Sequence, residues 1–239
     1  MFLNLGTAPQ GPPPPFSAWS SKQIQTIERA IARAWSQITV DLRCQAVLTG
    51  GTEPQITAML QDALCELLNS GQVAGFSPAT YMCPIRGQEL DDHTGERLEK
   101  RPDLTFPRLT SRPASNHNAL FFECKILGRG RTLDDYVKDG VRRFQDGIYA
   151  WAMPHAGMLA YVIGPEAADP GTALPAIWSP EPGPAAPYAP IERVSDEGGV
   201  PAVALSRHAR AFMLRNGEAP GHILLRHLWL HFPVPEEDR

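Results

Sequence analysis

Two charged residues interrupt an apolar stretch in the middle of the sequence. In 120-LFFECKIL-127, Glu123 and Lys125 lie among aliphatic and aromatic residues. Charged side chains seldom enter a buried strand unless they are paired or have a function. Because side chains alternate along a strand, Glu123 and Lys125 share one face and their neighbours share the other. The spacing therefore predicts an acid and a base that point together into a cleft.

A third charged residue, Asp103, opens the short apolar segment 103-DLTF-106. Neighbouring strands would bring Asp103 beside Glu123, and two carboxylates in a cleft of low polarity repel unless one is protonated or a cation lies between them. Carboxylate oxygens with room for water and a phosphate describe a Mg²⁺ site. An adjacent lysine can orient or activate the attacking water and offset charge on the phosphoryl group. The alternative interpretation is a structural cluster of ion pairs.

The Pro-Asp pair that ends at Asp103, followed by Glu123, Cys124 and Lys125, resembles the signature of the PD-(D/E)xK nuclease superfamily, which has the restriction-endonuclease-like fold. The likeness covers about residues 52–164. It implies that Asp103 is the central metal ligand, that Glu123 is the second ligand and that the backbone carbonyl of Cys124 is the third. Lys125 would be the catalytic lysine. The implied cofactor is Mg²⁺, for which Mn²⁺ would substitute.

Many members of this superfamily add an acid from the first core helix, and Glu53 is the candidate here. At 100° per residue it lies on the same side of its helix as Ile56 and Leu60. The alternative is a first-turn acid favoured by the helix dipole. The segment 145-QDGIY-149 resembles an additional motif of the helicase-associated exonuclease branch, so Gln145 and Tyr149 are expected to touch the site or the nucleic-acid strand. The alternative interpretation of this segment is a polar surface with a packed tyrosine.

The formal net charge is −4, but residues 97–143 carry eleven Lys or Arg and six Asp or Glu, a local charge of +5. A basic segment in an acidic protein can bind a phosphate-bearing partner, although a solvated surface has the same composition. Arg142 and Arg143 are the candidate phosphate contacts, with ordinary exposed cations as the alternative. The expected partner is DNA rather than RNA.

The elements that position these residues are predicted from the spacing of apolar residues. Helices are expected at 20–38, at 52–70 and at about 132–152. Strands are expected at 79–85, 103–106, 119–127 and 157–164, and the last strand candidate is at 222–232. A helix between the third and fourth strands implies a crossover and a partly parallel sheet. The expected class is α/β, with a restriction-endonuclease-like αβββαβ core, a mixed central sheet flanked by helices, an N-terminal helix and a C-terminal extension.

Composition divides the chain into four parts. These are a proline-rich tail (1–19), the nuclease-like core (20–164), a Pro/Gly/Ala-rich linker or surface excursion (165–201) and an accessory segment that packs on the core (202–239). No apolar run approaches the ~18 residues of a membrane helix, and the N-terminus has no secretory signal, so no membrane partner is expected. The four cysteines lack metal-site spacing and are interpreted as reduced packing residues, which favours the cytoplasm. They are Cys44, Cys65, Cys83 and Cys124.

Three functional hypotheses follow. The first is a metal-dependent nuclease that hydrolyses DNA in restriction, phage defence or repair, as a homodimer or as a subunit of a larger complex. The second is a non-catalytic subunit on the same fold that binds nucleic acid or a partner. The third is a hydrolase that uses Ser206 and His208, although the glycines of a nucleophile elbow are missing around the serine.

Overall fold

A five-stranded mixed sheet forms the centre of the computed structural model, with the strand order β1-β2-β3-β5-β4. The structure describes residues 15–96, 101–109, 115–164, 169–177 and 203–233. The strands are β1 (Leu104–Pro107), β2 (Ala119–Leu127), β3 (His155–Ile163), β4 (Val203–His208) and β5 (Ile223–Phe232). Pairs β2–β3 and β3–β5 are parallel, whereas β1–β2 and β4–β5 are antiparallel. The predicted α/β class with a mixed sheet is confirmed.

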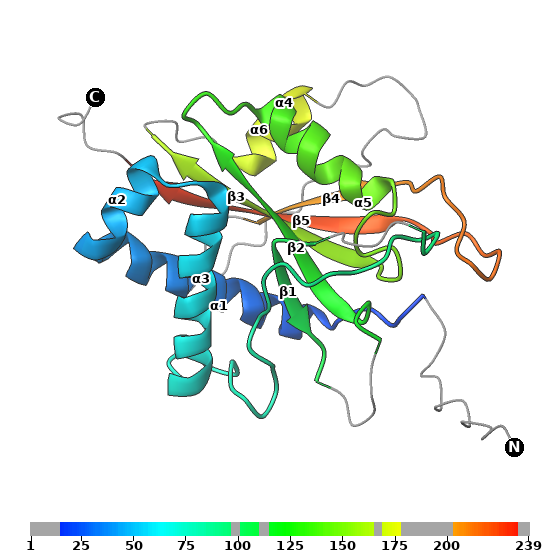
Figure 1. Ribbon diagram of the computed structural model, residues 1–239, viewed down its shortest axis with the longest axis horizontal. Coiled ribbons are helices and arrows are strands. Elements are labelled where there is room, and N and C mark those ends of the chain that lie inside the picture. The colour runs from blue at the N-terminus through cyan, green and yellow to red at the C-terminus, as the bar shows by residue number, and fades with distance from the viewer. Residues whose placement is uncertain (1–14, 97–100, 110–114, 165–168, 178–202, 234–239) are drawn as a thin grey trace, which may run out of the picture.

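Helices cover both faces of this sheet (Figure 1). On one side lie α1 (Ser21–Val40) and α3 (Glu53–Ser70), with α2 (Leu42–Gly50) between them in the chain. On the other side a continuous helical segment comprises α4 (Leu133–Tyr136), the π-helix η1 (Val137–Val141) and α5 (Arg142–Gln145), and α6 (Pro170–Ile177) lies beside it. Thr52 and Gln55 form a capping box at the start of α3, which satisfies backbone groups that a helix start leaves free.

The helices at 20–38 and 52–70 and the strands at 103–106, 119–127 and 157–164 are confirmed with nearly the predicted bounds. Strand β3 is buried along almost its whole length, as its apolar sequence predicted. The segment before β1 was predicted wrongly. Residues 79–85 do not form a strand, and only Ile85 forms a bridge, with Thr105. Pro84 lacks the N–H that a longer ladder would use.

The third predicted helix ends at Gln145 instead of residue 152. Gly147 explains the early end because its φ is +68°, which a side chain rarely adopts. A Cβ at this position would also lie 2.7 Å from atoms of His93 and Phe212. Helices α2 and α6 were not predicted from the sequence, and α6 lies inside the segment expected as a linker.

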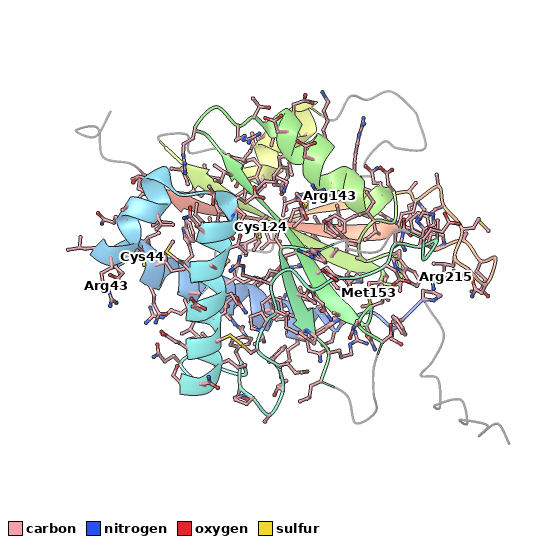
Figure 2. The ribbon with its side chains drawn as sticks, in the orientation of Figure 1. Arg43, Cys44, Cys124, Arg143, Met153 and Arg215 are labelled. Carbon is pink, nitrogen blue, oxygen red and sulfur yellow. A yellow bond between two sulfur atoms is a disulfide. The ribbon has the colours of Figure 1, made fainter. Side chains whose placement is uncertain are left out.

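The prediction of reduced cysteines is wrong for two of the four. Cys65 of α3 and Cys83 form a disulfide, with Cα atoms 5.4 Å apart, drawn as a yellow bond in Figure 2. Cys44 and Cys124 are free thiols. With Cys65 and Cys83 in a disulfide, the cysteines give no support for a cytoplasmic location, which stays a prediction. None of the helices in the described ranges is both long and apolar enough to cross a membrane.

The described part of 202–239 contributes β4 and β5 to the sheet itself. Strand β5 lies between β3 and β4, and helix α1 packs against it. The buried Arg226 forms an ion pair with Glu28 of α1, with Nε and Oε1 2.5 Å apart. The indole of Trp35 donates a hydrogen bond to the carbonyl of His231. The C-terminal strands therefore complete the layer that supports β2.

Candidate active site

The ammonium group of Lys125 lies at the centre of a cluster of oxygens. Its Nζ is 2.7 Å from Glu123 Oε1 and 2.7 Å from the carbonyl oxygen of Cys124. It is 3.2 Å from Glu53 Oε1 and 3.9 Å from Asp103 Oδ2. The structure thus brings together every residue that was predicted to be catalytic or to bind metal.

Three separate elements hold these groups in place. Glu123 and Lys125 alternate with Cys124 along β2, as the strand period predicted. Leu104 pairs with Phe122 in the antiparallel register, so Asp103 precedes β1 directly opposite Glu123. Its Oδ2 accepts a hydrogen bond from the backbone N–H of Cys124 at 2.8 Å.

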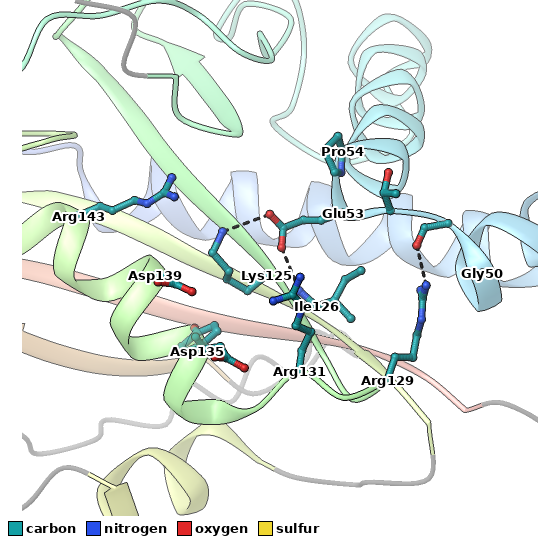
Figure 3. A pocket seen from close by; sticks show the side chains of 13 residues that line it. Gly50, Glu53, Pro54, Lys125, Ile126, Arg129, Arg131, Asp135, Asp139 and Arg143 are labelled. Atoms are coloured by element: carbon teal, nitrogen blue, oxygen red, sulfur yellow. Dashed lines mark hydrogen bonds and ion pairs between the residues drawn. The ribbon is translucent and has the colours of Figure 1, made fainter. Parts of the chain in front are cut away.

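Glu53 is the first residue of α3 and reaches the site from the opposite side. Its Oε2 accepts a hydrogen bond from the backbone N–H of Ile126 at 3.2 Å, and its Oε1 contacts Lys125 (Figure 3). One carboxylate therefore bridges the helix start and the strand. These contacts are additional to the interaction with the helix dipole that any acid in a first turn can have.

Burial controls the charge state of the cluster. Glu123 is fully buried, and this burial, together with the charge of Asp103, raises its pKa to about 8 against the opposing effect of Lys125 and Arg143. Burial likewise raises the pKa of Glu53. Burial lowers the pKa of Lys125, but the three surrounding carboxylates outweigh it and hold that pKa above its ordinary value. Lys125 is therefore protonated and positively charged near neutral pH in this arrangement.

Arg143 of α5 adds a second cation to Glu123. Its Nη1 lies 2.9 Å from Glu123 Oε1 and donates a hydrogen bond of 2.9 Å to the hydroxyl of Tyr149. That hydroxyl donates in turn to the carbonyl of Arg101. Figure 2 shows Arg143 and Cys124 near the middle of the molecule. Arg143 and Tyr149 are thus brought to the site, with Tyr149 acting through the arginine.

Two predicted nucleic-acid contacts are placed differently. Arg142 is exposed and Gln145 is the last residue of α5, and neither lines the pocket described below. Tyr149 follows the end of α5, so Gln145 and Tyr149 do not share a helical face. The predicted helical Q-x-x-x-Y arrangement is therefore wrong, although its tyrosine reaches the cluster.

A pocket of about 520 Å³ opens beside Glu53 and Lys125 (Figure 3). Its size is within the usual range for ligand sites. The start of α3, the end of β2 and the helical segment from Asp135 to Arg143 form its walls. Two further arginines that line it, Arg129 and Arg131, were counted in the basic segment but not predicted as site residues.

The donor set fits a hard divalent cation. Three carboxylates and one carbonyl converge on a single positively charged atom, and Mg²⁺ prefers such oxygens. The buried Oε2 of Glu123 has no hydrogen-bond partner among the described residues, so it retains a lone pair for a ligand. In this conformation no group of three or more Asp, Glu, His or Cys side chains in the described ranges is spaced to hold a metal. The ammonium group of Lys125 occupies the space between the three carboxylates of Glu53, Asp103 and Glu123.

The residues of the hydrolase hypothesis form a different, buried cluster. Ser206 Oγ lies 2.7 Å from His208 Nε2 and 2.7 Å from His227 Nε2. The Nδ1 of His227 lies 2.8 Å from the hydroxyl of Tyr136. Ser206 and His208 are each only 1% exposed, so the surrounding protein shields them from a substrate in this conformation.

Comparison with known proteins gave no match to a family model, a curated protein or a solved structure. The resemblance to the PD-(D/E)xK superfamily therefore stays a prediction, which rests on Asp103, Glu123 and Lys125 and on the geometry around them.

Proposed function

We propose that this protein is a metal-dependent nuclease that hydrolyses phosphodiester bonds of DNA. The observation that carries the proposal is the convergence of Glu53, Asp103, Glu123 and the Cys124 carbonyl on one cationic centre beside an open pocket. Burying charges costs several kcal/mol when they are unpaired. A chain that needed only a stable core has no reason to gather three carboxylates at this place.

The carboxylates and the carbonyl would hold Mg²⁺ once Lys125 moves out of their centre. When bound, the metal would polarise a phosphoryl oxygen and lower the pKa of a coordinated water. In the reaction, the water oxygen forms a new bond to phosphorus and one P–O ester bond breaks. The products are a phosphomonoester and a free hydroxyl.

Lys125 would act as a cation in this reaction. Before a metal binds, the surrounding carboxylates hold the pKa of Lys125 above its ordinary value. An ammonium group can orient the attacking water and offset the negative charge that develops on the phosphoryl oxygens. Arg143 would hold the carboxyl group of the buried Glu123 in position through their 2.9 Å contact.

The test is cleavage of supercoiled plasmid with Mg²⁺, compared among matched variants. We expect Lys125→Ala and Asp103→Asn to lower the rate by roughly 100-fold or more, the size of effect seen when an electrostatic group is removed from an active site. Lys138→Ala and Asp134→Asn are the controls, because these residues form an exposed ion pair on the helical segment. The controls should cleave at the wild-type rate, and EDTA should stop every cleaving sample.

Binding of Mn²⁺, followed by electron paramagnetic resonance, gives a readout that does not depend on turnover. Asp103→Asn should weaken it and Asp134→Asn should not. Cleavage that survives both Lys125→Ala and Asp103→Asn would refute the proposed site. Binding of DNA without any cleavage by the wild-type protein would favour a non-catalytic subunit.

A further inference from the structure

A basic loop follows β2 and forms one wall of the pocket. Gly128, Arg129 and Gly130 have φ values of +89°, +55° and +81°, and Gly128 forms a bridge with Arg131. Positive φ is uncommon for a residue with a side chain and costs free energy. The tight turn that results places two arginines, Arg129 and Arg131, at the pocket.

Arg129 and Arg131 keep most of their N–H donors available for a ligand. Arg129 donates one hydrogen bond, from Nη2 to the carbonyl of Gly51 at 2.9 Å (Figure 3), which leaves most of its five N–H donors free to bind a ligand. Among the described residues, no carboxylate lies within ion-pair distance of Arg129 or Arg131. Both residues are exposed and line the pocket.

The acids of the pocket wall are engaged or turned to solvent. Glu53 contacts Lys125 and Ile126. Asp135 accepts hydrogen bonds from the backbone N–H and the hydroxyl of Thr132. These bonds, with a smaller contribution from the charge of Arg131, lower the pKa of Asp135. Asp139 is exposed. The start of α3 contributes little to anion binding, because its capping box is closed and Pro54 has no N–H.

The loop begins beyond the carboxylates in the direction of β2. Gly128 is three residues beyond Lys125, about 10 Å at the rise of a strand. Arg143 contacts Glu123, two residues before Lys125. The cations thus lie on both sides of the carboxylate cluster in the direction of β2, and Figure 3 shows Arg143 and Arg129 on opposite sides of Lys125.

We propose that Arg129 and Arg131 bind a second phosphate of the substrate strand, next to the phosphate that lies at the carboxylates. The substrate is then a nucleic-acid strand with consecutive phosphates, and a small phosphodiester fills only part of the site. This inference rests on the proposed function for the position of the reacting phosphate. Guanidinium groups suit the second position because they bind phosphate oxygens in a bidentate manner.

The test measures binding of a short fluorescent single-stranded DNA in EDTA at several salt concentrations, so that no turnover is involved. Each phosphate contact that is lost reduces the slope of log K against log salt by about 0.7 for a single strand. Because both arginines are proposed to bind the same phosphate, we expect Arg129→Ala/Arg131→Ala to reduce the slope by about 0.7. The control with the same change of charge, Arg33→Ala/Arg86→Ala, removes exposed arginines away from the pocket and should leave the slope unchanged.

Arg131→Ala alone is a check that the loop is intact, because Arg129 and not Arg131 makes the hydrogen bond to Gly51. This variant should also reduce the slope, by no more than about 0.7. A slope that is unchanged in both loop variants, or reduced equally in the control, would overturn the proposal. So would a wild-type protein that does not bind the strand.

A second comparison separates this inference from the proposed function. With Mg²⁺, hydrolysis of bis(4-nitrophenyl) phosphate should be the same for the wild type and the double loop variant, whereas cleavage of the oligonucleotide should fall. Equal losses on both substrates would contradict a second phosphate site. If the wild-type protein hydrolyses neither substrate, the proposed nuclease activity fails, and the salt slope still decides whether the loop binds phosphate.

Discussion

Lys125 Nζ contacts the same oxygens that a divalent cation would need, because one positive charge in the middle of three carboxylates lowers their mutual repulsion. Without it, Glu123 would be buried beside Asp103 with only Arg143 to balance the two charges. The ammonium therefore stabilises the arrangement of ligands. In the proposed mechanism a metal would have to compete with this ammonium group, and the lysine would then move toward the pocket, where a phosphate could contact it.

The residues of this cluster were predictable from the sequence because each follows a local rule. The strand period puts Glu123 and Lys125 on one face, and the helix angle turns Glu53 inward. The choice between Arg142 and Arg143 was not predictable. The π-helix η1 precedes them, and its i→i+5 bonds change the side of the helix that later residues face. A prediction that assumes 3.6 residues per turn throughout the helix does not include this change of face.

The two neighbouring arginines provide a test at the scale of a single residue. Arg143→Ala removes the cation that contacts Glu123 and Tyr149, and we expect kcat/KM for DNA cleavage to fall roughly 100-fold. Arg142→Ala makes the same change of charge one residue away and should leave kcat/KM within about twofold of wild type, because surface cations contribute little. Urea unfolding of both variants checks that the fold is intact. Equal losses in the two variants would mean that only the charge of the helix matters.

At the scale of elements, the predictions succeeded where an element buries one continuous apolar stripe. Helix α1 buries residues at helical spacing from Ile24 to Ile38, and β2 and β3 are buried along nearly their whole length. Helix α2 was missed because Leu48 is its only buried residue, so its sequence has no stripe to detect. At Gly147, just after α5, His93 and Phe212 leave no room for a side chain, and both residues are far away in the sequence.

The pairing of β2 with β3 supplies a test of how closely these elements pack. Gly157 pairs with Phe122, and a Cβ at Gly157 would lie 2.1 Å from ring atoms of that phenylalanine. We expect Gly157→Ala to lower the free energy of unfolding by about 1–3 kcal/mol, because the ring must shift in a packed core. Urea denaturation monitored by circular dichroism measures the change.

The matched control for this substitution is Gly50→Ala at the end of α2. A Cβ there would meet no atom within 4 Å, and the change should stay within about 0.5 kcal/mol of wild type. A destabilisation of similar size in both variants would show that the loss of glycine, and not the contact with Phe122, has the larger effect.

At the scale of the molecule, the C-terminal strands decide how the sheet is completed. Their apolar sequence predicted a strand at 222–232, but not its place between β3 and β4. Strand order depends on contacts between segments that are distant in sequence, which local periodicity does not describe. One consequence is the buried chain of hydrogen bonds that joins β4 and β5 to α4, from His208 through Ser206 and His227 to Tyr136.

This chain of polar groups makes the stability of the whole protein sensitive to acid. Burial lowers the pKa of His208 to about 4 and that of His227 to about 3, whereas an unfolded histidine titrates near about 6.5. Above that pH both imidazoles are neutral in either state. Below it the unfolded chain binds protons that the folded chain excludes. The free energy of unfolding therefore falls as the pH is lowered from about 6.5 toward 4.

Replacing one histidine isolates this effect from the buried acids, whose raised pKa values act in the opposite direction. Well below pH 6.5, His208→Gln should remove about 1.4 kcal/mol per pH unit from the slope of unfolding free energy against pH. His222→Gln is the control because this histidine is exposed, and it should keep the wild-type slope. Urea denaturation at a series of pH values between about 4.5 and 7 measures all three proteins. If His208→Gln keeps the wild-type slope, His208 is not held neutral by burial.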